Sequence, residues 1–227
     1  MSNSAGAPGP GKPLPAPSVR AQLLATEHWG LLASRSTAQA EVLTRISMFL
    51  MFTSASLVSL ALVGQATGFT GMFLMLAIIV IAIDALMGLL TQQRVMNVAM
   101  EDLMYVLAMN RLRAAYVELD PGVARYLMAS AHDDEAGAGR TYDFFGSRTD
   151  FSQVSGSSAM FMTAANSTLL GILAGVVVTA AGAGTAVAVA LGAVCGLAFL
   201  GLTLAGGYRR YRTVWAGHTP VSPSPEG

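Results

Sequence analysis

The sequence predicts an all-α, polytopic membrane protein built from two transmembrane helical hairpins and a cytosolic helical layer. Hydrophobic residues fill 53% of its 227 positions and charged residues only 11%, a balance typical of membrane proteins. The charges are also unevenly placed, since Asp84 is the only ionised side chain between Ile46 and Arg94 and none lies between Phe151 and Tyr208. One helix needs about 20 residues to cross a bilayer, so each of these runs is long enough for two.

Changes in composition divide the chain into six segments. These are a disordered N-terminal segment (1–17), a cytosolic or interfacial helix (18–45), transmembrane hairpin 1 (46–90), a cytosolic helical extension and loop (91–157), transmembrane hairpin 2 (158–207) and a cytosolic tail (208–227). The first segment is predicted to be disordered because Gly, Pro, Ala and Ser cannot bury a core. Each hairpin has a short uncharged linker, at 64–68 and at 180–184, so its two helices are expected to be antiparallel neighbours.

The remaining totals exclude several classes of function. The formal net charge is zero, so the chain lacks the overall basic character that would indicate nucleic acid as a partner. The single cysteine, Cys195, excludes a disulfide framework within one chain. The first residues lack the charged start and apolar core of a cleavable signal peptide, so the first span is expected to direct the chain to the bilayer.

The helix before the first span carries conflicting signals. Ser18 can cap its start, and Ser36 with Gln39 has the spacing of a capping box, so a new helix is expected to begin at Ser36. Trp29 and Arg35 suit a helix that lies at the lipid headgroups. Packing against the cytosolic helices explains them equally well.

The second span is predicted to continue far beyond the bilayer. No proline or glycine interrupts residues 90–119, and one apolar stripe follows helical spacing. The stripe consists of Met96, Met100, Leu103 and Leu107. Such a helix would project about 40 Å into the cytosol. Asp120 and Pro121 then predict a shorter helix up to Ala131, followed by a loop at 132–156.

The basic residues predict the orientation. Every lysine and arginine lies at or before Arg45, between 94 and 148, or at or after Arg209, so neither hairpin turn has one. The positive-inside rule therefore places both termini and the central region in the cytoplasm, in a plasma (inner) membrane. Arg209, Arg210 and Arg212 are the expected interfacial anchor of the tail.

One polar layer is predicted to cross all four spans. Asp84 leads it, because a carboxylate near the bilayer centre costs about 2.5 to 3.5 kcal/mol and such residues usually face a bundle interior or an aqueous cavity. The other members lie at similar depths from the cytosolic ends of their spans: Asn166, Thr53, Ser54 and Thr203. The layer is either a protonation or cation site in a conducting path, or a protonated Asp84 that is hydrogen-bonded to Asn166 or a hydroxyl and holds the bundle in register.

Spans three and four carry small residues every fourth position, which lets helix backbones approach closely. They are Ser167, Gly171, Gly175 and Thr179 in one span and Ala188, Gly192 and Gly196 in the other. The pattern predicts packing of the two spans on each other; a seam between protomers is the alternative.

The cytosolic helix carries two acidic residues without an intrahelical partner. Glu101 and Asp102 have no basic residue three or four positions away. Their predicted partners are Arg35, Arg45, Arg111, Arg113 or a second subunit, unless the face is simply solvated.

Residues 132–135 (His-Asp-Asp-Glu) are predicted to be an exposed acidic turn and not a metal site, because neighbouring residues do not converge on one ion and no HExxH or EF-hand spacing is present. No nucleotide-binding loop, nucleophile elbow or paired-cysteine site appears. We therefore expect no cofactor, no metal and no enzymatic activity.

Three short stretches carry a resemblance to a known group. They are HWGLLASRS at 28–36, Met109 to Arg113, and His132-Asp133-Asp134. Together they resemble a group of uncharacterised four-span integral membrane proteins of actinobacteria, over residues 26–206. The resemblance implies a membrane fold and a bacterial source and implies no activity.

Two functions follow from these patterns. The first is a self-associating channel-like or transport protein that uses the polar layer around Asp84. The alternative is a non-conducting membrane scaffold that recruits a cytosolic protein through residues 92–131, with Glu101, Asp102, Arg111 and Arg113 as contacts. Both have the lipid bilayer and further copies of the chain as partners.

Overall fold

The computed structural model describes residues 16–143, 146 and 156–225, and every regular element in them is helical. The elements are α1 (Pro17–Thr67), α2 (Gly71–Leu119), the 3-10 helix η1 (Pro121–Tyr126), α3 (Glu135–Tyr142), α5 (Ser158–Ala180) and α6 (Thr185–Gly217). The all-α prediction is confirmed for this part of the chain. Most residues of the segment predicted to be disordered, 1–17, lie outside it, and Pro17 is the first residue of α1.

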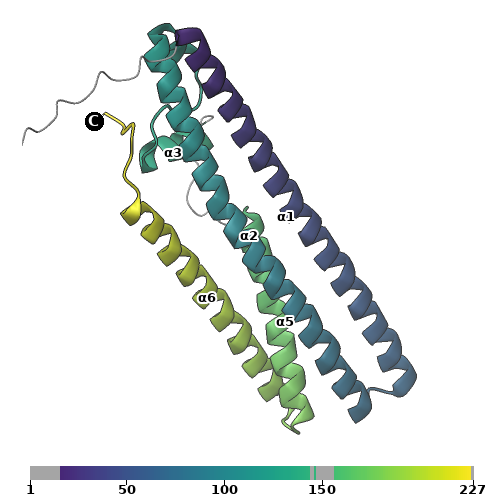
Figure 1. Cartoon of the computed structure of the whole chain (residues 1–227). Coiled ribbons are helices and arrows are strands. Elements are labelled where there is room, and N and C mark those ends of the chain that lie inside the picture. Colours follow the sequence, from purple (N-terminus) through teal and green to yellow (C-terminus); the bar gives the residue numbers. More distant parts are fainter. Residues whose placement is uncertain (1–15, 144–145, 147–155, 226–227) are drawn as a thin grey trace, which may run out of the picture.

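Two long helices, α1 and α2, and two shorter ones, α5 and α6, form the main bundle, with η1 and α3 near one end of it (Figure 1). α1 and α2 run antiparallel side by side, α5 packs on α2, and α6 packs on α5. The turns 68–70 and 181–184 lie at one end of the molecule, while the first residues of α1, the last residues of α2 and α3 lie at the other. α2 is therefore the central helix, with α1 on one side and α5 on the other.

The four long helices α1, α2, α5 and α6 are each long and apolar enough to cross a membrane. Only 17% to 28% of the residues in their most apolar stretches are buried inside the chain. Most of the apolar surface thus faces outward, where hydrocarbon or another protein chain would cover it.

α1 is one continuous helix, so the predicted break at Ser36 is wrong. The Gln39 amide, which would close the capping box, donates instead to Asp102 Oδ1 at 2.8 Å. The Thr37 hydroxyl donates to the carbonyl of Ala33 one turn back, at 2.9 Å, as in a helix interior. Ser18 is not the cap either, because Pro17 occupies the first helical position and Ala16 precedes it.

The turn between α1 and α2 is shorter than the predicted linker at 64–68. α1 continues to Thr67 and ends at Gly68, whose φ of 67° is the left-handed conformation that favours glycine. The Phe69 ring then lies against Gly64, where a Cβ atom would collide with it, and stacks edge-on with Phe73. Because Gly64 has no side chain, the Phe69 ring fits against it and the chain can reverse its direction here.

α2 is continuous from Gly71 to Leu119, which confirms that the helix of the second span continues without a break beyond residue 90. At about 1.5 Å per residue its 49 residues span about 74 Å. One apolar core joins α2 to α1 and α5 through residues such as Phe49, Ile81 and Met162. A second, smaller core near the far end combines Leu103 and Leu107 with α3 and α6.

Three further predictions need correction. The helix after Asp120 is the short η1, which ends at Tyr126, although Asp120 accepts from the Gly122 amide as expected for its start. The predicted loop at 132–156 contains α3, capped by Asp134; most of residues 144–155 lie outside the described residues. The tail predicted at 208–227 begins as helix, because α6 continues to Gly217.

Candidate functional site

The candidate site is a buried polar core between α1, α2 and α5. Asp84, Gly88 and Gln92 follow one another every fourth residue and so lie on one face of α2. Asp84 is completely buried, and its Oδ1 accepts a hydrogen bond of 3.1 Å from the Ser56 hydroxyl of α1. A carboxyl group is thus held at the contact between two helices that are otherwise apolar at this level.

A chain of amide and hydroxyl groups continues the core toward α5. The Asn166 amide donates to Gln92 Oε1 at 2.5 Å, and the Gln92 amide donates to Thr163 Oγ1 at 3.1 Å. The Thr163 hydroxyl donates to the Ala159 carbonyl at 2.8 Å. All three of these polar side chains are buried. Buried amides of this kind hold two helices in one register, because an unpaired amide is costly.

Three buried oxygens of the core have no hydrogen-bond partner among the described residues. They are Thr53 Oγ1 of α1, Asp84 Oδ2 of α2 and Asn166 Oδ1 of α5. Gly88 makes room for the last of these, since a Cβ atom there would collide with Asn166 Oδ1 and approach the Phe49 ring to 2.9 Å. The core therefore contains acceptors that a proton, a water molecule or a cation would satisfy.

The predicted layer is brought together only in part. Asp84 and Asn166 are both buried on neighbouring helices, but the hydrogen-bond partner of Asp84 is Ser56. Ser54 is exposed, and Thr203 is half-buried on α6, which packs on α5 and not on α1. Sequence reasoning missed Ser56, Gln92 and Thr163. The signal for Gln92 was its position eight residues after Asp84, which returns to the same face of the helix.

The small residues of hairpin 2 lie where α5 meets α6. A Cβ atom on Gly171 would lie 2.9 Å from the Gly192 carbonyl oxygen, and one on Gly196 would lie 2.7 Å from that of Ser167. A Cβ atom on Gly175 would lie 3.3 Å from the Ala188 carbonyl oxygen. The same residues also line an open apolar groove of about 630 Å³ that runs along the helix pair.

The acidic residues of the projecting helix have partners within the chain. Asp102 lies 2.6 Å from Arg35 Nε of α1 and 2.8 Å from the Tyr142 hydroxyl of α3. Burial alone would raise the pKa of Asp102, but the hydrogen bonds from Arg35 and Tyr142 outweigh it and hold the pKa below its ordinary value. Of the partners predicted for Asp102, Arg35 is thus the one that pairs with it in the structure.

Glu101 pairs with a residue that the sequence reasoning did not consider. Arg94, seven residues earlier on α2, donates to Glu101 at 2.8 Å and to Glu41 of α1 at 2.8 Å. Arg45 also pairs with Glu41, at 2.9 Å, and not with Glu101 or Asp102. A search limited to residues three or four positions away therefore misses this pair, because Arg94 and Glu101 are seven residues apart on α2.

Arg111 and Arg113 have different partners again. Arg113 donates to Asn110 Oδ1 at 2.6 Å, and burial, together with nearby Arg35, lowers its pKa. Arg111 forms an ion pair with Asp133, a residue of the segment predicted to be an exposed turn. All four charged residues that are predicted to contact a partner therefore have contacts inside the chain.

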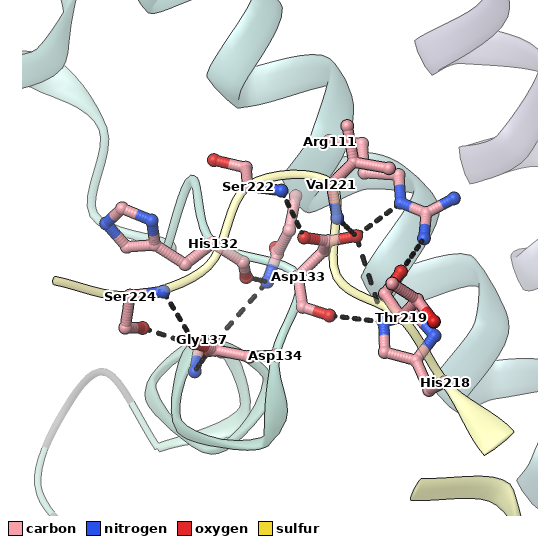
Figure 2. Close-up of polar contacts among 11 residues, drawn as sticks. Arg111, His132, Asp133, Asp134, Gly137, His218, Thr219, Val221, Ser222 and Ser224 are labelled. Carbon is pink, nitrogen blue, oxygen red and sulfur yellow. Dashed lines mark hydrogen bonds and ion pairs between the residues drawn. The ribbon is translucent and has the colours of Figure 1, made fainter. Parts of the chain in front are cut away.

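The prediction of an exposed acidic turn at 132–135 is wrong. Asp133 is completely buried because residues 218–225, which follow α6, lie over it (Figure 2). Its carboxylate accepts from the backbone amides of Val221 and Ser222 at 3.1 and 2.7 Å. No local pattern indicates this contact, since nearly 90 residues separate the partners.

No three His, Cys, Asp or Glu side chains within the described residues are arranged to hold a metal ion. Comparisons of the chain with protein families, with curated proteins and with solved structures found no match. Its function is therefore inferred from the chemistry of its own residues.

Proposed function

We propose that this chain is an integral membrane protein that moves protons or another small monovalent cation, with Asp84 as the group that binds them. The observation that supports this most is the set of three unpartnered oxygens, on Thr53, Asp84 and Asn166, within the described core. A buried carboxyl group in apolar surroundings is costly unless it is protonated or paired with a cation. Asp84 receives one hydrogen bond, from Ser56, which leaves its second oxygen for that role.

The polar core extends from Asp84 toward only one end of α2. From Asp84 to Gln92 it extends over eight residues, or about 12 Å along α2, and ends near the ion pairs of Arg94. In the other direction the buried residues next to Asp84 are apolar, namely Leu60, Ala77 and Ile81. Access to Asp84 is thus proposed from the end of α2 that carries the charges, and the apolar side is the barrier that transport must open.

The proposed topology has two transmembrane hairpins with both termini in the cytoplasm of a plasma (inner) membrane. No lysine or arginine of the described residues lies between Arg45 and Arg94 or between residues 156 and 208, so the helix halves next to the turns 68–70 and 181–184 carry none. In this orientation the N-terminal half of α1, the C-terminal half of α2, α3 and residues 218–225 form the cytosolic layer. Asp84 then exchanges with the cytoplasm.

Self-association is proposed as a separate property. Because Asp84 is buried within one protomer, the pathway runs through each protomer and a central pore of a ring would not contain it. The groove along α5 and α6 and the outward apolar surface of α1 are areas that further copies would cover.

The alternative, a scaffold that recruits a cytosolic protein through residues 92–131, has less support. Its predicted contacts Glu101, Asp102, Arg111 and Arg113 all have partners inside the chain. What favours it is the exposure of Met104, Tyr126 and Met128, which are 54%, 70% and 64% exposed.

The test is a flux measurement on purified protein in liposomes, with a trapped pH-sensitive dye and an imposed potential. We expect proton or Na⁺ flux for the unchanged chain and its loss in Asp84→Asn, which keeps the shape of the side chain and removes its charge. Glu101→Gln is the matched control, because it removes a carboxylate in the cytosolic layer and should leave the flux unchanged. Flux that persists in Asp84→Asn, or no flux of either ion in the unchanged chain, would rule out the proposal. Loss of flux in Glu101→Gln alone would also count against Asp84 as the group that binds the ion.

A further inference from the structure

Residues 218–225 follow α6 and bind to Asp133 and Asp134, which directly precede α3. The His218 ring nitrogen Nε2 lies 2.7 Å from the Asp133 carbonyl oxygen, and the Asp133 amide donates to the Ser222 carbonyl at 3.1 Å. Asp134 accepts from the Ser224 amide at 2.5 Å and from its hydroxyl at 2.9 Å (Figure 2). With the bonds to the Asp133 carboxylate, two adjacent acidic residues fix the backbone of the whole segment.

α6 depends on this connection because it has little other support there. α5 has 23 residues and α6 has 33, so α5 covers only the first part of α6. Beyond Gly206 and Gly207, α6 bonds to α2 through Arg210 and Asn97 at 3.1 Å. Next to that bond lies a crevice of about 540 Å³, lined by Asn97, Met100, Glu101, Met104, Tyr105 and Arg210.

Further along, α6 packs on the small core of Leu103, Leu107 and Ala138 through partly buried Tyr211, Val214 and Trp215. This contact is less extensive than the packing of α5 on α6, although the Tyr211 hydroxyl also donates to Glu135 at 3.2 Å. Gly207 lies against α2, since a Cβ atom there would lie 3.1 Å from Met96 Cε. Two consecutive glycines at such a contact are a common place for a helix to bend.

We propose that residues 218–225 are a releasable tether, which holds the cytosolic end of α6 against α2 and α3 and keeps the crevice between α2 and α6 narrow. When the tether leaves Asp133 and Asp134, α6 bends at Gly206 and Gly207 and the crevice opens. The device is independent of the proposed ion flux, because its contacts lie in the cytosolic layer and do not include Asp84.

The chemistry of the segment explains why it can be released. Val221 is 74% exposed, Pro223 and Pro225 are exposed and Pro220 is only partly buried, so apolar burial contributes little to holding the tether. Pro220, Pro223 and Pro225 lack amide hydrogens, which leaves the amides of Val221, Ser222 and Ser224 as the donors. Most of the binding is therefore hydrogen bonding, to the two carboxylates and to the backbone of Asp133. Water can replace these hydrogen bonds.

The test measures the distance from α6 to α1 by pulsed electron resonance in nanodiscs. Spin labels are placed at exposed positions, with Trp29→Cys on α1 and Arg212→Cys on α6, in a Cys195→Ser background. The chain is compared with Asp133→Asn and with a version that ends at Gly217. We expect a narrow distance distribution in the parent and a broader one, shifted to longer distances, in both variants.

Asp120→Asn is the matched control, because this carboxylate caps η1 and does not contact the tether. It should keep the narrow distribution. The shortened chain leaves every buried residue of the helices unchanged, so it remains informative if Asp133→Asn fails to fold. An unchanged distribution in the shortened chain would overturn the proposal, since the packing of Tyr211 and Trp215 would then hold α6 without the tether.

Discussion

Arg35 of α1 and Asp102 of α2 form a two-point ion pair, with Arg35 Nε 2.6 Å from Asp102 Oδ1 and Nη2 3.1 Å from Oδ2. Gln39 and Tyr142 donate to the same carboxylate, so α1, α2 and α3 meet at one acidic group. This planar pairing has geometric specificity that an apolar stripe lacks. It fixes how far α1 and α2 are shifted along each other in the part of the molecule beyond hairpin 1.

Asp102→Asn should therefore destabilise the chain by about 1 to 3 kcal/mol, because it leaves the partly buried Arg35 without its counter-charge. The measurement is thermal unfolding in detergent, followed by tryptophan fluorescence. Glu118→Gln is the control: it breaks the exposed pair with Arg20, and such pairs contribute about 0 to 1 kcal/mol. Equal effects of both substitutions would mean that the Arg35 pair has no special role.

Release of the tether by acid is a second prediction. Burial alone would raise the pKa of Asp133 and Asp134, but hydrogen bonds outweigh it. Bonds from Arg111 and the amides of Val221 and Ser222 lower the pKa of Asp133, and bonds from Ser224 and the Gly137 amide lower the pKa of Asp134. A lowered pKa stabilises the bound tether above the unfolded value of about 3.9, and this stabilisation is lost as the pH falls through the folded value.

The measurement for this prediction is the mobility of a spin label at Val221→Cys, an exposed position of the tether. We expect restricted motion at neutral pH and free motion below about pH 4. The other charged or titratable groups around the two carboxylates are Arg111, His132, Glu135 and His218. His132→Gln and His218→Gln should keep the transition in the same range; a transition that moves with either histidine would assign the effect to that residue.

The long helices could be predicted from the sequence because their signals are local. Runs without charge, the absence of proline and glycine from 90–119, and the glycines at 182 and 184 all act over a few residues. The errors occurred where a tertiary contact overrides a local pattern. Gln39 fits a capping box, yet its amide binds Asp102 on another helix, so α1 continues without a break.

The candidate site shows the same limit in another form. Counting residues from the end of a span gives the depth of a side chain in the bilayer, and on that basis Asp84 and Asn166 were placed in one layer. Depth does not give rotation about the helix axis, so Ser54 was chosen although Ser56, two residues later, is the one that contacts Asp84. Asp133 could not be placed at all, because its partners lie in a distant segment without periodicity.

Close packing of α5 on α6 leads to a third prediction. Gly192→Ala should destabilise the helix pair by about 1 to 3 kcal/mol, because the new Cβ atom would lie 2.6 Å from the backbone oxygen of Gly171, which cannot move aside as a side chain can. Gly201→Ala on the same helix has open space around it and should stay within about 1 kcal/mol of the parent. Thermal unfolding in nanodiscs compares the two. A harmless Gly192→Ala would show that α5 and α6 separate freely in the bilayer.

Gly88→Ala is the most specific test of the polar core, because it adds one methyl group and changes no charge. The new Cβ atom would displace Asn166 Oδ1 and press on the Phe49 ring, which should break the hydrogen bond from Asn166 to Gln92 while Asp84 stays in place. If the amides are part of the path from the cytosolic layer to Asp84, flux in liposomes should fall although the carboxyl group is intact. Gly71→Ala, at the start of the same helix with open space around it, should keep full flux. Normal flux in a folded Gly88→Ala protein would limit the site to Asp84 and Ser56, and would leave Gln92 and Asn166 with a purely structural role.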